Sequence, residues 1–110
     1  MSSISVIFCL IHGEQSKSAF SVRIDRAETV SMLRECIVAK NPTYFKGIDP
    51  RELSLWRVSI LDGDEKVPFL TDSNELRPTW KISKAFLQGV PEGHIHIIAK
   101  APWEKGMFLS

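Results

Sequence analysis

The sequence predicts an α+β domain in which one main helix lies across a mixed sheet of four or five strands. Three observations support this fold class. Apolar runs suited to central strands stand near both ends of the chain, over residues 4–11 and 94–100. A helical repeat of apolar residues stands between strand-like segments, over residues 29–41. A further strand-like segment, residues 53–60, follows this helix and contains neither Gly nor Pro.

Size and composition indicate one domain. The chain has 110 residues, 44% of them hydrophobic, which is enough to form a core. The net charge of +1 argues against a nucleic-acid-binding surface spread over the domain. Two cysteines, Cys9 and Cys36, are too few for a disulfide scaffold and indicate buried, reduced thiols. No apolar run reaches the roughly 20 residues that a membrane-spanning helix needs.

The first two strands are expected to form a β-hairpin. Residues 4–11 lack the basic leading region and cleavage site of a signal peptide, so we interpret them as a strand. Polar residues 12–17 make the turn, and residues 19–25 alternate apolar and polar. The side chains of this second strand expected in the core are Phe20, Val22 and Ile24. Period two divides the first strand into Ile4, Val6, Phe8 and Leu10 on one face, and Ile7, Cys9 and Ile11 on the other.

Residues 29–41 are expected to form the main helix. Thr29 is a suitable N-cap, because its hydroxyl can accept a hydrogen bond from a first-turn amide. Val30, Leu33 and Ile37 recur at helical spacing and share one face. Pro42 ends the helix by restricting Asn41. The apolar face should lie on the concave side of the sheet.

Residues 53–60 are expected to form a strand with a broken alternation. Leu53 and Leu55 share one parity, whereas Trp56, Val58 and Ile60 share the other. A strand with period two cannot bury both sets on one face. We therefore expect a bulge, an edge position or a strand that is apolar on both sides.

The remaining elements are shorter. Residues 67–70 are expected to form a brief edge strand, and residues 82–87 a helical turn with Ile82 and Phe86 on one side. The last strand, residues 94–100, should direct Ile95, Ile97 and Ala99 inward, and His94, His96, Ile98 and Lys100 outward. We expect the first and last strands to pair in parallel at the sheet centre. Residues 1–100 then form the domain, and residues 101–110 form a tail or a linker to a further domain.

This order of elements is that of the β-grasp fold, and the hairpin, capped helix and last strand resemble ubiquitin. Four side chains of the two central strands are expected to face outward on the helix-free side and form a partner patch: Ile7, Cys9, His96 and Ile98. An apolar patch in that place is costly to leave in water, so we expect a protein partner. Alternatively, residues 61–78 or the tail cover this face.

Residues 53–60 also resemble a family signature. They are similar to the Leu-x-Leu-Phe-Leu-Ala-Lys motif in the N-terminal domain of Crinkler effectors, which oomycetes and some fungi secrete, and closer to the Leu-x-Leu-Trp-Lys-Val-x-Ile form of fungal members. The residues that correspond to the translocation motif are Leu53, Leu55, Trp56, Arg57, Val58 and Ser59. The resemblance extends to residues 19–25, 30–34, 39–42, 49–53, 82–86 and 94–98.

The resemblance implies a function in delivery. In this family the N-terminal domain is linked to export and uptake by host cells, and a separate C-terminal domain acts in the host, usually in the nucleus, in virulence or symbiosis. It implies a non-catalytic module without a cofactor, with a host protein or a second copy as partner. The motif differs from the oomycete form at Trp56, Arg57, Val58 and Ser59. Its apolar residues are also those that a core strand needs, so their first role is predicted to be folding.

Two further classes of function are weighed against delivery. A stand-alone intracellular ubiquitin-like adaptor would have the same fold and no role in export. A metal or small-ligand protein would use His94 and His96, two residues apart on one strand, but zinc needs about four ligands. The acidic residues 62–65 lack the later ligands of a calcium loop. No nucleophile or phosphate-binding motif is present, so the sequence predicts no enzyme and no cofactor.

Overall fold

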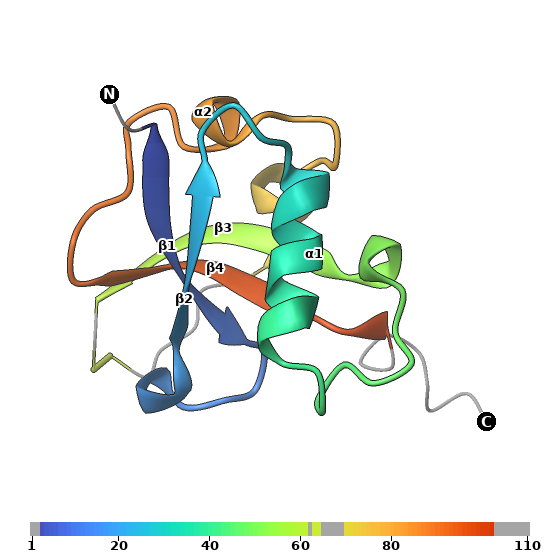
Figure 1. Cartoon of the computed structure of the whole chain (residues 1–110). Coiled ribbons are helices and arrows are strands. Elements are labelled where there is room, and N and C mark those ends of the chain that lie inside the picture. The colour runs from blue at the N-terminus through green and yellow to red at the C-terminus, as the bar shows by residue number, and fades with distance from the viewer. Residues whose placement is uncertain (1–2, 62, 65–69, 103–110) are drawn as a thin grey trace.

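The computed structural model describes residues 3–61, 63–64 and 70–102 and confirms an α+β fold (Figure 1). A four-stranded sheet has the order β2-β1-β4-β3, and α1 lies across one of its faces. The elements are β1 (Ile4–Ile11), β2 (Phe20–Asp25), α1 (Val30–Lys40), β3 (Ser54–Leu61), α2 (Ile82–Ala85) and β4 (His94–Lys100). Most of the predicted edge strand at 67–70 lies outside the described residues.

The two central strands are the first and the last, as predicted. β1 and β4 are parallel, and their register pairs Cys9 with Ile97 and Ile11 with Ala99. β2 and β3 flank them in antiparallel pairs. β4 is buried on both faces, and so is the end of β1 from Cys9 to Ile11, which fits the apolar character of these two runs. The arrangement is consistent with the expected ubiquitin-like fold.

Helix α1 is held by its apolar face and by its first turn. Val30, Leu33 and Ile37 are fully buried against the sheet. The Thr29 hydroxyl accepts a hydrogen bond from the Met32 N–H at 3.3 Å, as the capping prediction requires. Two more first-turn amides donate to carbonyl groups of a distant segment, Val30 to Trp80 at 2.8 Å and Ser31 to Pro78 at 3.1 Å. The helix start is therefore fixed by tertiary contacts as well as by its own cap.

Helix α2 is shorter than predicted and is attached to the turn before α1. It spans Ile82–Ala85, whereas the sequence predicts a turn over residues 82–87. The Ile82 N–H donates to the Glu28 carbonyl at 2.8 Å, and the Ser83 N–H donates to the Arg26 carbonyl at 3.0 Å. Ile82 and Phe86 are buried together in the main core, as expected from their spacing.

Strand β3 confirms two of the expected irregularities. It is an edge strand of the sheet, and its register with β4 shifts between Arg57, which pairs with Ile97, and Ile60, which pairs with Ile95. Two residues of β3 therefore stand opposite one residue of β4, as in a β-bulge. Leu53 and Leu55 lie in the helix-side core, whereas Ile60 lies in a cluster on the other face.

That second cluster corrects part of the predicted core. It consists of Leu10, Ile60, Ile95 and Ile98, with Ala19, Val58 and Leu70 packed against it. The prediction that Ile95 shares the helix-side core with Ile97 and Ala99 is wrong. Ile95 pairs with Ile60 of the same cluster, beyond the register shift that separates this pair from Arg57 and Ile97. Leu70 packs on this part of the helix-free face, which favours the alternative that residues 61–78 cover it.

Candidate protein-interaction surface

The predicted partner patch is not at the surface. Ile7 and Cys9 are fully buried in the helix-side core, and His96 and Ile98 are only 3% and 1% exposed. The expectation that these four side chains face outward together is therefore wrong. The error follows from register, because residues paired across parallel strands share a face, and Cys9 pairs with the inward-facing Ile97.

The exposed apolar side chains of β1 are those of the opposite parity. Ile4, Val6 and Phe8 are 44%, 39% and 41% exposed, and we call these three residues the β1 stripe. Their partners on β2 are polar: Asp25 is opposite Ile4, and Arg23 is opposite Val6. At Phe8 the stripe reaches a cavity of about 430 Å³, which is also lined by Ser16, Lys17, Ala19, Gly93, His94 and Ile95. The alternation in the sequence places Ile4, Val6 and Phe8 on one face of β1, but it does not show whether that face or the opposite one is exposed.

His96 is a buried link between β1, β4 and the loop before β4. The Phe8 N–H donates to its Nδ1 at 3.0 Å, so the ring proton must be on Nε2, which donates to the Pro91 carbonyl at 2.6 Å. The rings of Phe8 and Phe86 lie next to the imidazole, with centroids 6.3 and 6.4 Å away. Burial lowers the pKa of His96, the hydrogen bond to Pro91 raises it, and the charge of His94 lowers it further. The geometry therefore favours a neutral ring.

The other titratable candidates give no sign of a reactive site. His94 contacts the Glu92 carbonyl through Nδ1 at 2.9 Å. Within the described part of the chain, no three His, Cys, Asp or Glu side chains gather as metal ligands. Burial raises the pKa of Cys9 far above its ordinary value and also raises that of Cys36. A thiol with a raised pKa is a poor nucleophile, so both cysteines behave as core residues.

The translocation-motif-like residues divide into a buried half and an accessible half. Leu53, Leu55 and Trp56 are 1%, 0% and 7% exposed, and the first two belong to the helix-side core. Arg57 and Ser59 are exposed, and Val58 is half-buried. The first half of the motif therefore contributes to the core, and the second half is the part that a partner can reach.

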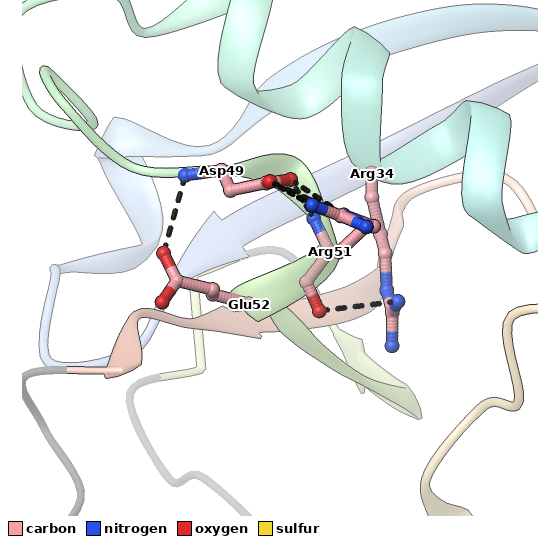
Figure 2. A network of polar contacts seen from close by, with 4 residues as sticks. All are labelled: Arg34, Asp49, Arg51 and Glu52. Atoms are coloured by element: carbon pink, nitrogen blue, oxygen red, sulfur yellow. Dashed lines mark hydrogen bonds and ion pairs between the residues drawn. The ribbon is translucent and has the colours of Figure 1, made fainter.

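A polar network positions the start of this strand (Figure 2). It surrounds the short 3₁₀ turn Pro50–Glu52. The Asp49 carboxylate accepts a hydrogen bond from the Arg51 N–H at 2.9 Å, and the Asp49 N–H donates to Glu52 Oε1 at 3.2 Å, which forms a capping box. Arg51 Nη2 pairs with Asp49 Oδ2 at 2.7 Å, and hydrogen bonds from Arg51 lower the pKa of Asp49. Arg34 Nη1 reaches the Arg51 carbonyl at 3.4 Å, so the network joins the turn to α1.

Sheet order, the single long helix and the parallel central strands define a ubiquitin-like β-grasp domain. The chain belongs to the Crinkler effector protein N-terminal domain family, whose sequence pattern matches residues 6–100. This confirms the resemblance found in residues 53–60 and in the segments around them.

Two relatives carry the same domain in longer chains. Crinkler effector protein 1 of Rhizophagus irregularis is 39% identical over 99 residues, which cover 87% of this chain and 21% of the relative. Crinkler effector protein 108 of Phytophthora sojae is 44% identical over 57 residues, which cover 52% of this chain and 7% of the relative. The chain therefore matches about a fifth, or less, of the length of these relatives. In the described residues, no helix is long and apolar enough to cross a bilayer.

Proposed function

We propose that this chain is the non-catalytic N-terminal module of a secreted Crinkler-type effector, and that it serves delivery into host cells and contact with a protein partner. Membership of the family carries the proposal, because the matched pattern covers residues 6–100. The relatives contain much additional chain, which leaves room for a separate domain that acts in the host cytoplasm or nucleus. The module itself would then transport and bind rather than catalyse.

The structure supports a protein surface as the place of contact. The β1 stripe presents three large apolar side chains on a sheet face that α1 does not cover. Contiguous exposed apolar side chains are costly in water and often mark interaction sites. The net charge of +1 favours a protein over a nucleic acid as partner. That partner is a host protein or, in weak self-association, a second copy of the chain.

Leu55→Asp tests whether the motif acts first through folding. Leu55 is fully buried in the helix-side core, and an unpaired carboxylate there should cost about 3–5 kcal/mol or more and unfold the domain. Uptake of a fluorescent fusion by plant cells should then be lost together with the folded circular-dichroism spectrum.

Ser59→Asp provides the matched control, since it introduces the same charge at an exposed position of the motif. It is expected to remain folded. A Leu55→Asp protein that keeps the native spectrum and melting transition but still fails in uptake would contradict a primary role in folding.

A further inference from the structure

The accessible half of the motif lines a cavity beside the sheet edge. Residues 57–59 form one side, residues 86–89, which follow α2, form another, and Asn74 and Pro91 complete the lining. The cavity has a volume of about 660 Å³. It lies where the register between β3 and β4 shifts, between Arg57 and Ile60. Bulges often re-aim side chains next to binding sites, and here the bulge and the cavity share the same residues.

The segment after β3 returns along its outer edge beside this cavity. Trp56 and Glu75 form an antiparallel bridge, and the Leu76 N–H donates to the Leu55 carbonyl at 2.9 Å. Residues on either side of such a bridge also stand opposite each other, so Asn74 lies opposite Arg57. Asn74 lines the cavity as well. An occupant of the cavity would therefore be held by side chains and not by an added strand.

The lining of the cavity indicates the chemistry of an occupant. Leu87 is 76% exposed, the largest exposed fraction among the large apolar side chains of the described residues, and Phe86 beside it is buried. Arg57 is the one charged side chain among the described residues that line the cavity. Its Nη1 donates to the Ala85 carbonyl at 2.9 Å, which fixes the guanidinium at the wall. A guanidinium has five N–H donors in a planar fork, and the bond to Ala85 uses one of them. The other N–H groups of Arg57 can donate to a carboxylate.

We propose that this cavity binds a segment of a partner protein that carries a carboxylate next to a large aliphatic side chain. The carboxylate would meet the Arg57 guanidinium, and the aliphatic side chain would pack on Leu87 and Phe86. This inference deepens the proposed delivery function and rests on it, because it gives the second half of the motif a ligand of defined chemistry.

A displayed library of random 12-residue peptides, selected on the full chain, tests the proposal without a known partner. Enriched peptides are expected to place Asp or Glu within two positions of Leu, Ile or Val. In NMR titrations, a synthetic copy of the strongest peptide should shift the amide signals of residues 57–59 and 86–89. It should leave the signals of the β1 stripe unchanged.

Two variants and one matched control distinguish binding at this cavity from a nonspecific effect of net charge on peptide affinity. Arg57→Glu should weaken binding of the peptide by about tenfold or more, because hydrogen bonds to charged groups are among the stronger polar contacts. Leu87→Ser should also weaken it and, since Leu87 is largely exposed, should leave thermal unfolding unchanged. Arg23→Glu makes the same charge reversal on β2, at a position that does not line this cavity, and should change affinity by less than about twofold.

The outcomes also separate this inference from the delivery function. Equal losses of affinity in Arg57→Glu and Arg23→Glu, or signal shifts confined to the β1 stripe, would overturn the peptide site. Uptake that persists while no peptide binds at residues 57–59 would overturn it too, and would leave delivery standing. Peptide binding at the cavity by a chain that cells do not take up would support the site and reject delivery.

Discussion

At the scale of single residues, His96 shows how burial and partners set the behaviour of a side chain. A histidine on a strand between two apolar residues suggests a surface position, yet His96 is buried. Its ring accepts from the Phe8 amide and donates to the Pro91 carbonyl, so each nitrogen has a defined role. Protonation would place an N–H at Nδ1 against the Phe8 N–H. The two donors would then face each other without an acceptor.

This arrangement predicts a loss of stability in mild acid. The folded pKa of His96 lies below its ordinary value of 6.5, chiefly because of burial. As pH falls below 6.5, the unfolded chain takes up the proton before the folded one, so the free energy of unfolding falls until the pH passes the folded pKa. Urea denaturation at several pH values between pH ~5 and pH ~7.5 measures this slope.

His96→Gln should lower the free energy of unfolding near neutral pH by about 1–3 kcal/mol and should flatten this slope. An unchanged slope in His96→Gln would show that another group controls the response to acid.

At the scale of elements, α1 combines a local signal with distant support. Thr29 and the helical repeat are readable in the sequence, and the structure confirms both. The carbonyl groups of Pro78 and Trp80, which receive two first-turn amides, lie about 50 residues further along the chain and have no local signal. A capping residue at this helix is therefore one of several supports, and its removal should weaken the fold without abolishing it.

Thr29→Ala is expected to lower the free energy of unfolding by about 1 kcal/mol, because the Met32 N–H loses its side-chain acceptor. Thr29→Ser keeps the hydroxyl and should cost only a few tenths of that amount. Chemical denaturation followed by circular dichroism distinguishes the two. A serine variant as unstable as the alanine variant would mean that the methyl group, and not the cap, matters.

At the scale of the whole molecule, the two faces of the sheet differ in how they are covered. One face packs on α1, and the other is partly covered by its own cluster around Ile98. The β1 stripe lies outside both clusters and remains exposed. Removing apolar character from the stripe should therefore affect association with other molecules more than folding.

Val6→Lys is expected to reduce weak self-association at high concentration, measured by sedimentation equilibrium. The free energy of unfolding should fall by no more than about 1 kcal/mol, because the new ammonium would stand opposite Arg23. Met32→Lys is the matched control, because Met32 is 37% exposed and Val6 39%, but Met32 lies on α1. Equal effects of both variants, or none from Val6→Lys, would argue against the β1 stripe as the contact.

The elements of this fold could be predicted because their signals are local. The alternation in residues 19–25, the cap and repeat of α1 and the two apolar terminal runs each depend on neighbours in the chain. The motif-like residues 53–60 could be assigned to a strand for the same reason. Their mixed parity indicated a bulge, an edge position or a strand that is apolar on both sides, and the structure shows a register shift at an edge strand. The resemblance to the Crinkler family supported these assignments further, because its segments occur in the same order along this chain.

The sequence by itself determined the strands and the main helix of the α+β architecture and the folding role of the apolar motif residues, since period and propensity act over a few residues. The parallel centre of the sheet was expected from the order of these elements, which is that of the β-grasp fold. Only the tertiary structure decided which face of β1 meets the helix, because that depends on the register of Cys9 with Ile97, which lie near opposite ends of the chain. It also decided that His96 is buried and that Arg57 stands beside a cavity. Both positions depend on how β3, β4 and the segment after α2 meet in space.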